Sequence, residues 1–177
     1  MVVQTFYAIA PLRFDFDPQY SEIDWEYLPN GGWGDVHTRL YAVSWQTARL
    51  DPWLAVNDAT QAQRSVDGWH ELVVQVSGGH TRWYLDGADF AQHGGRNYPV
   101  VPMSISFSIW FSPGGLLPDA GAARSYEERV DWVFHARNQV LAPAQVRERI
   151  AALRRAGVHR HDSVPAADPP LPSSCDL

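Results

Sequence analysis

Apolar and polar positions alternate along much of the chain, and this alternation predicts β-strands. It is clearest at residues 103–111, where five apolar side chains alternate with three serines and Trp110. Within residues 128–136, Val130, Trp132 and Phe134 alternate in the same way. We expect seven or eight short strands, at residues 2–10, 21–28, 40–47, 69–76, 81–85, 88–92, 103–111 and 128–136. Short strands separated by turn signals are typical of an all-β sandwich.

The segments between these strands carry recognisable turn signals. Asp86-Gly87 predicts a two-residue hairpin of type I′ between residues 81–85 and 88–92. Residues 29–34 form a glycine-rich loop, and residues 51–67 read as a polar connection without a clear period. We therefore expect a continuous β-domain over residues 1–137.

The last forty residues change in character. Val146, Ile150 and Leu153 recur at helical spacing, with Pro143 at the start and Gly157 at the end. Proline suits a first helical turn and glycine suits the position after a helix. This predicts a helical segment over residues 138–157, followed by a disordered tail at 158–177 rich in Pro, Ala, Ser and Asp. A cluster in the tail, residues 159–162 (His-Arg-His-Asp), is read as solvated, so no metal site is expected.

Charge and composition exclude several classes of function. The net charge of the 177 residues is −6, which argues against nucleic acid and anionic membranes as partners. No apolar run reaches the length of a membrane span, and the single Cys175 allows no intrachain disulfide. The first seven residues lack the basic and small-residue pattern of a signal peptide and look like the middle of a strand. Nothing in the sequence indicates a cofactor.

The candidate chemistry lies in residues 21–28. In a strand, Glu22, Asp24 and Glu26 share one face, while Ile23, Trp25 and Tyr27 share the other. Three neighbouring carboxylates raise the pKa of at least one of them, at a cost to stability that suggests a function. The alternative is a solvated face of an edge strand.

Retaining glycoside hydrolysis requires such a set, with one ionised and one protonated carboxyl group about 5–5.5 Å apart. Glu22 and Glu26 would lie roughly 13 Å apart at Cα, and long side chains can close that gap. Asp24, short and between them, would hold the charge state of a neighbour. From spacing alone, the roles of the two glutamates are interchangeable.

Candidate sugar-binding residues lie elsewhere in the chain. Sugars bind by stacking on aromatic rings and by hydrogen bonds to their hydroxyls. The face of residues 104–110 that carries Ser106, Ser108 and Trp110 fits this chemistry. Trp33 either borders the site as a sugar platform or packs its own loop, and Trp83 either lines the site or belongs to the core.

The sequence resembles family 16 glycoside hydrolases, which include laminarinases, lichenases and xyloglucan endotransglycosylases. Residues 22–26 match the Glu-x-Asp-x-Glu signature of that family. Four further segments resemble its strands in the family's order: residues 3–7, residues 69–72 with the Trp-Tyr-Leu-Asp-Gly hairpin at 83–87, residues 102–110, and residues 130–133.

The resemblance implies an all-β jelly-roll sandwich of two curved antiparallel sheets with a short C-terminal helix. It implies Glu22 as nucleophile, Glu26 as acid/base and Asp24 as electrostatic helper, acting on internal bonds of a β-glucan-like polysaccharide or oligosaccharide. It also implies secretion, and strands ahead of Val2 that this chain does not contain, hence a truncated sandwich. The alternative is a non-catalytic carbohydrate-binding module or an inactive fragment. Linkage, hydrolysis versus transglycosylation, oligomeric state and a structural Ca²⁺ are left open.

Overall fold

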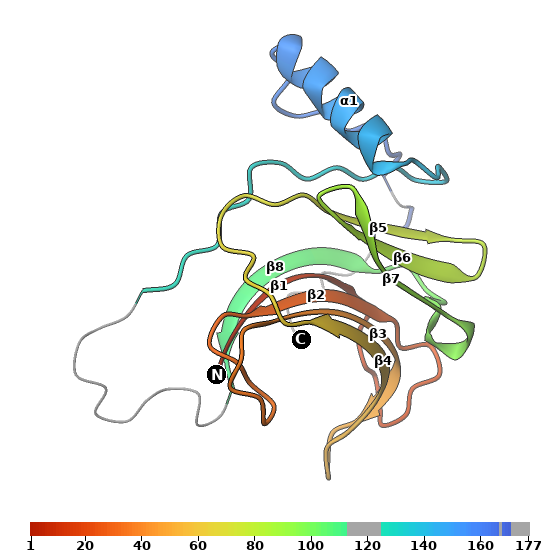
Figure 1. Cartoon of the computed structure of the whole chain (residues 1–177). Helices are drawn as coiled ribbons and strands as arrows, with labels where there is room; N and C mark the ends of the chain where they lie inside the picture. Colours follow the sequence, from red (N-terminus) through yellow and green to blue (C-terminus); the bar gives the residue numbers. More distant parts are fainter. Residues whose placement is uncertain (113–124, 167, 171–177) are drawn as a thin grey trace.

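The computed structural model describes residues 1–112, 125–166 and 168–170 as two antiparallel sheets and one helix (Figure 1). The larger sheet has the strand order β4-β3-β2-β1-β8, and the smaller has β5-β6-β7. The strands are β1 (Val2–Ile9), β2 (Glu22–Leu28), β3 (Arg39–Arg49), β4 (Leu54–Ala62), β5 (Leu72–Ser77), β6 (His80–Leu85), β7 (Ala88–Gly94) and β8 (Ser104–Phe111). A 3₁₀ turn, η1 (Gly95–Asn97), follows β7, and the helix α1 spans Pro143–Arg155. The all-β jelly-roll prediction is confirmed.

The larger sheet is arched, and the smaller sheet lies against its convex side, with α1 beyond it (Figure 1). The core between the sheets is formed by apolar side chains from both: Ile23, Trp25, Tyr27, Leu40, Ala42, Trp83 and Leu85. Burying these side chains is the main favourable contribution to holding the two layers together. The opposite face of β2 therefore looks into the concave side of the arch.

The predicted hairpin at Asp86-Gly87 is confirmed. Both residues have positive φ, at 53° and 85°, as a type I′ turn requires. The hairpin joins β6 to β7 and places Trp83 and Leu85 of β6 in the core. The apolar face of the smaller sheet therefore meets the larger sheet through residues of β6.

Two sequence predictions about strands were wrong. Residues 51–67, predicted as a polar connection, contain β4, which pairs with β3 at the edge of the larger sheet. An edge strand that is exposed over much of its length carries polar residues, so its sequence shows no apolar alternation. Residues 128–136, predicted as a strand, pair with no other strand in the part of the chain that the structure describes.

Segment 128–136 instead packs over the convex face beside β1 and β8. Trp132 and Phe134 line a cavity of about 820 Å³ together with Phe6 and Ile105. Alternation shows that a segment has an apolar face, whereas a strand also needs a backbone partner, and that partner depends on tertiary structure.

The helix prediction is confirmed, and Val146 and Ile150 of α1 are buried. Residues 158–166 and 168–170 contain no helix or strand, and the rest of the predicted tail lies outside the described residues.

No helix among the described residues is both long and apolar enough to span a membrane.

Candidate active site

Strand β2 carries three carboxyl groups on the concave side of the larger sheet. Its alternate residues Ile23, Trp25 and Tyr27 are in the core, so Glu22, Asp24 and Glu26 face the other way. The strand lies in the middle of the sheet, between β1 and β3. The face predicted from alternation is therefore confirmed, and the alternative of an edge strand is excluded.

Each carboxyl group has a defined pair of neighbours across the sheet. Glu22 lies beside Trp45 and Ile9, Asp24 beside Val43 and Tyr7, and Glu26 beside Tyr41 and Thr5. Asp24 is only 4% exposed, whereas Glu22 and Glu26 are half-buried. The outer two carboxyl groups can therefore reach a bound molecule, while Asp24 acts through its neighbours.

Hydrogen bonds distinguish the three acids. The Tyr20 hydroxyl donates to Oε2 of Glu22, and the indole Nε1 of Trp45 donates to Oδ2 of Asp24 at 2.8 Å. Asp24 and Glu22 also share a hydrogen bond, which lowers the pKa of Glu22 and raises that of Asp24. Glu26 accepts no hydrogen bond from any residue that the structure describes. Glu22 thus has two hydrogen-bond partners, Tyr20 and Asp24, and Glu26 has none among the described residues.

These contacts give the acids different proton affinities. Burial raises the pKa of Glu22 above its usual value, and the hydrogen bonds with Tyr20 and Asp24 make that rise smaller. Burial and the charge of Glu22 raise the pKa of Glu26 to about 8. Burial and both neighbouring glutamates raise the pKa of Asp24 well above its usual range. Of the two reachable acids, Glu22 therefore has hydrogen bonds that favour its ionised form, whereas both influences on Glu26 favour its protonated form.

Strand β8 supplies the hydroxyl groups predicted to bind sugar. Ser108 lies opposite Thr5 and exchanges a 2.8 Å hydrogen bond with its hydroxyl, and Thr5 is the neighbour of Glu26. Ser106 lies opposite Tyr7, which is the neighbour of Asp24. Both serines therefore stand on the same face as the acids, two strands away.

Trp33 stands near the Glu26 end of the row of acids. Its ring is 52% exposed and lies edge-on to Tyr41, with ring centres 5.2 Å apart. Tyr41 is the cross-strand neighbour of Glu26. An exposed ring beside the acids is available for stacking on a sugar.

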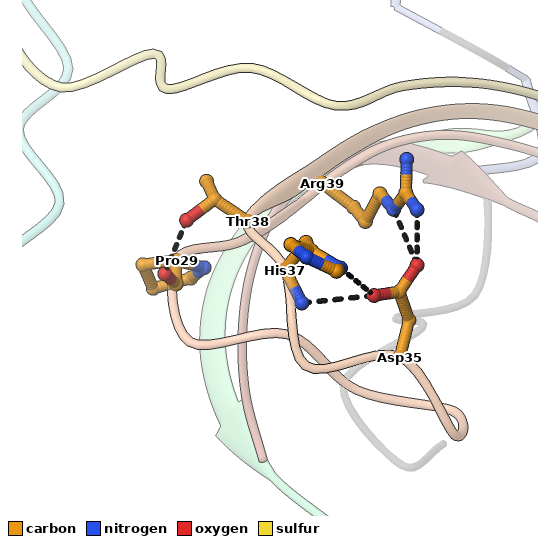
Figure 2. A network of polar contacts seen from close by, with 5 residues as sticks. All are labelled: Pro29, Asp35, His37, Thr38 and Arg39. Atoms are coloured by element: carbon orange, nitrogen blue, oxygen red, sulfur yellow. Dashed lines mark hydrogen bonds and ion pairs between the residues drawn. The ribbon is translucent and has the colours of Figure 1, made fainter.

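The loop that carries Trp33 is fixed by a polar network around Asp35 (Figure 2). The carboxylate of Asp35 accepts from the backbone N–H of His37 at 2.8 Å and from the Arg39 guanidinium Nε at 2.7 Å. These donors hold the pKa of Asp35 far below its usual value. At the base of the loop, the Thr38 hydroxyl donates to the Pro29 carbonyl at 2.7 Å.

Gly31 shows how closely this loop is packed. Its φ is +71°, and a Cβ placed there would lie 2.4 Å from the backbone oxygen of Asp35. Only glycine tolerates both the conformation and the approach. The loop therefore presents Trp33 from a rigid base.

We expect Asp35→Ala to weaken glycan binding without touching the acids. Loss of the contacts to His37 and Arg39 frees the loop, so Trp33 is no longer held beside Tyr41. KM should rise roughly three- to tenfold, with a smaller change in kcat, as expected when one stacking contact is lost. Steady-state kinetics on a soluble β-glucan measures this.

Asp131→Ala is the matched control, because it also removes an aspartate paired to an arginine, Arg154, on the far side of the molecule. An unchanged KM for Asp35→Ala would contradict the positioning role of the loop.

A family model for glycosyl hydrolases family 16 matches residues 2–133. The chain belongs to this family. No curated protein and no solved structure gives a significant match to it. Membership of family 16 supports glycosidase activity on β-glycans in general and a polysaccharide as binding partner.

Among the predicted sugar contacts of this family 16 chain, Trp83 is the one that the structure corrects. It is fully buried, with its ring 4.6 Å from that of His93, so it cannot stack on a sugar from solvent. The alternative core role is the right one. Trp110 is 37% exposed and lies opposite Val3 of β1. Val3 is two residues along β1 from Thr5, the cross-strand neighbour of Glu26. Trp33 and Trp110 thus remain candidate sugar platforms.

Sequence reasoning missed Tyr20 and Trp45, which donate hydrogen bonds to Glu22 and Asp24. Tyr20 precedes β2 and lies outside the strand alternation, so no periodic signal singled it out. The sequence predicts a strand at Trp45, but its contact with Asp24 depends on the register between β2 and β3.

In the described part of the chain, no group of three or more His, Cys, Asp or Glu side chains is arranged to hold a metal ion.

We expect Tyr20→Phe to shift the acidic limb of the pH–rate profile to higher pH. The Tyr20 hydrogen bond lowers the pKa of Glu22, so removing it raises that pKa, and a higher pH is needed to ionise Glu22. The measurement is kcat/KM against pH on one soluble substrate.

Tyr27→Phe is the matched control, since its hydroxyl bonds Asp67 at 2.9 Å on the other face of the same strand. A shift of equal size in both variants would contradict the role of Tyr20.

Proposed function

We propose that this protein is a retaining glycosidase that cleaves or transfers at internal β-glycosidic bonds of a β-glucan-like polysaccharide. The observation that carries the proposal is the unequal set of contacts at the two reachable acids. Two hydrogen bonds favour the charged form of Glu22, while burial and the nearby charge favour the protonated form of Glu26. Retaining hydrolysis uses one carboxylate and one carboxylic acid in this way.

In the first step, the Glu22 carboxylate attacks the anomeric carbon and forms a covalent bond to it. The bond from that carbon to the leaving oxygen breaks, and Glu26 gives its proton to that oxygen. Glu22 loses its negative charge as the bond forms. The pKa of Glu26 then falls, which suits its next role as a base.

In the second step, Glu26 takes a proton from the acceptor hydroxyl, and the acceptor oxygen displaces Glu22. The acceptor is water in hydrolysis or another sugar hydroxyl in transglycosylation. The two inversions leave the anomeric configuration unchanged. Asp24 contributes by its hydrogen bond to Glu22, and Trp45 fixes the position of Asp24.

Substrate class and location are proposed from the family. The concave face carries the half-buried hydroxyl group of Ser108 and exposed rings at Trp33 and Trp110, a combination suited to an extended neutral glycan. A polymeric substrate outside the cell agrees with the secretion that the family resemblance implies.

The test is a substrate panel of laminarin, lichenan and xyloglucan. Release of reducing ends from any of them, with NMR showing the retained anomer first, supports the proposal. Binding without release from all three would favour a non-catalytic carbohydrate-binding module. Release with inversion would overturn the assigned mechanism.

A further inference from the structure

Asp17 is a fully buried carboxylate in the connection between β1 and β2. It accepts two hydrogen bonds from the guanidinium of Arg13, from Nε at 2.6 Å and from Nη2 at 2.8 Å. The backbone N–H groups of Gln19 and Arg13 also donate to it, at 2.9 Å and 3.3 Å. These donors, the guanidinium first, hold the pKa of Asp17 far below its usual range. Asp17 therefore stays charged throughout the pH range of an enzyme assay.

The backbone carbonyl of Asp17 collects two further donors. The backbone N–H of Tyr20 donates to it at 3.2 Å, and the hydroxyl of Thr47 on β3 donates to it at 3.0 Å. Thr47 is itself buried, so this contact fixes the turn to the body of the larger sheet. Asp17 therefore joins three points that are separate along the chain: the start of the turn, the residue before β2, and β3.

The backbone of Tyr20 is fixed on its other side as well, by Ser21. The Ser21 carbonyl accepts from the backbone N–H of Ala10 at 2.8 Å, and its hydroxyl accepts from that of Val100 at 2.9 Å. The side chain of Tyr20 is buried, and its hydroxyl donates to Oε2 of Glu22. The direction of that hydroxyl is therefore set by the turn on one side and by Ser21 on the other.

Tyr20 is the link between this turn and the acids. Among the described residues, Glu22 exchanges hydrogen bonds with Tyr20 and with one other acid of β2. Its cross-strand neighbours, Trp45 on β3 and Ile9 on β1, carry no charge. The other titratable groups that face Glu22 are the two further acids of β2 itself. The ion pair in the turn makes no contact with Glu22, so its contacts reach that acid through Tyr20.

We propose that Asp17 and Arg13 are a positioning pair for the candidate active site, holding Tyr20 so that its hydroxyl keeps donating to Glu22. That hydrogen bond favours the ionised form of Glu22, which a nucleophile needs. A loosened turn would let Tyr20 move away, and Glu22 would then require a higher pH to ionise. This inference rests on the proposed function and extends the site to two residues outside the sheet.

The alternative is that the pair only stabilises the fold, because breaking any buried ion pair is costly. A purely structural pair would lower the melting temperature when it is broken and leave the proton affinity of Glu22 unchanged. A positioning pair changes that proton affinity. The pH dependence of catalysis therefore separates the two roles.

The experiment measures kcat/KM against pH for Arg13→Gln and Arg13→Lys on the best polymer of the panel. Glutamine removes the charge, whereas lysine keeps it but cannot form the paired contact of a guanidinium. In both variants the acidic limb should move to higher pH by roughly 0.5 to 1 unit, as expected when a hydrogen bond to a charged group weakens. Arg154→Gln is the matched control: it is also paired to an aspartate, and its side chain is 54% exposed against 53% for Arg13. Its acidic limb should not move.

A second comparison separates positioning from the direct field of the Arg13 charge. In a Tyr20→Phe background there is no hydroxyl left to position, so Arg13→Gln should add no further shift. A further shift as large as that in wild type would overturn the proposal. So would an unmoved acidic limb in both Arg13 variants, or a shift in Arg13→Gln that is absent from Arg13→Lys, since the charge alone would then account for it.

A carbon-13 NMR titration of the glutamate carboxyl groups tests the pair without turnover, with the Glu22 signal identified by its absence in Glu22→Gln. The pKa of Glu22 should rise in Arg13→Lys and stay unchanged in Arg154→Gln. If wild type cleaves no polysaccharide and this rise is seen, the proposed function fails and the positioning pair stands. If wild type cleaves and the pKa of Glu22 does not rise in Arg13→Lys, the positioning pair fails and the proposed function stands.

Discussion

Glu22→Gln should reduce turnover of every substrate by roughly 10⁴-fold or more, as loss of a covalent nucleophile does in other enzymes. The amide keeps the shape of the side chain and its contact with the Tyr20 hydroxyl, but it cannot attack the anomeric carbon. Reducing-end release from the best polymer of the panel measures the loss. The melting temperature should not fall, because the variant removes a charge from a buried row of acids.

A mechanism-based fluoro-sugar provides the direct readout for Glu22. It should add one sugar to wild type, and peptide mapping should find it on Glu22. Glu148→Gln, at an exposed glutamate of α1, is the matched control and should keep full activity. Labelling of any other carboxyl group would reassign the nucleophile.

Glu26→Ala should lower polysaccharide cleavage by roughly 10²–10⁴-fold, yet spare release of a nitrophenol much more. A sugar oxygen needs a proton to leave, whereas nitrophenolate leaves without one. The pKa of Glu26, raised to about 8, gives a second readout. Wild-type kcat/KM should fall above about pH 8 as Glu26 loses its proton, and that limb should vanish in Glu26→Ala.

The raised pKa of Glu26 also has a consequence for stability. The folded state holds the proton more tightly than the unfolded chain, whose glutamate titrates near its usual 4.5. Above that pH, folding is penalised progressively until Glu26 ionises in the folded state at about pH 8. Glu26→Gln should therefore raise the melting temperature at pH 8 more than at pH 4.

The kinetic role of Glu26 has its own contradicting outcome. If Glu26→Ala lost equal activity on the polymer and on the nitrophenyl substrate, and the basic limb of its pH–rate profile were unchanged, Glu26 would not be the acid/base.

The sequence by itself determined the features that depend on local periodicity. Alternation assigned Ile23, Trp25 and Tyr27 to the core and the three acids to the opposite face, because successive strand residues point to opposite sides. The Asp86-Gly87 turn followed in the same way, since its backbone conformation restricts the residue types. The helix of residues 143–155 was equally readable from its spacing and its ends.

Tertiary structure decided what depends on contacts between distant residues. The donors to Glu22 and Asp24 come from Tyr20 and from Trp45 on another strand, so the unequal proton affinities were invisible in the spacing of the acids. Burial also decided between the two roles left open for Trp83, which is fully buried, whereas Trp33 is 52% exposed. Strand β4 has no apolar alternation in its sequence, and it forms because its backbone pairs with β3. Residues 128–136 alternate but form no strand, because none of the described strands pairs with them. Periodicity reports which face of a segment is apolar, whereas hydrogen-bond partners and burial are fixed only when the sheets assemble.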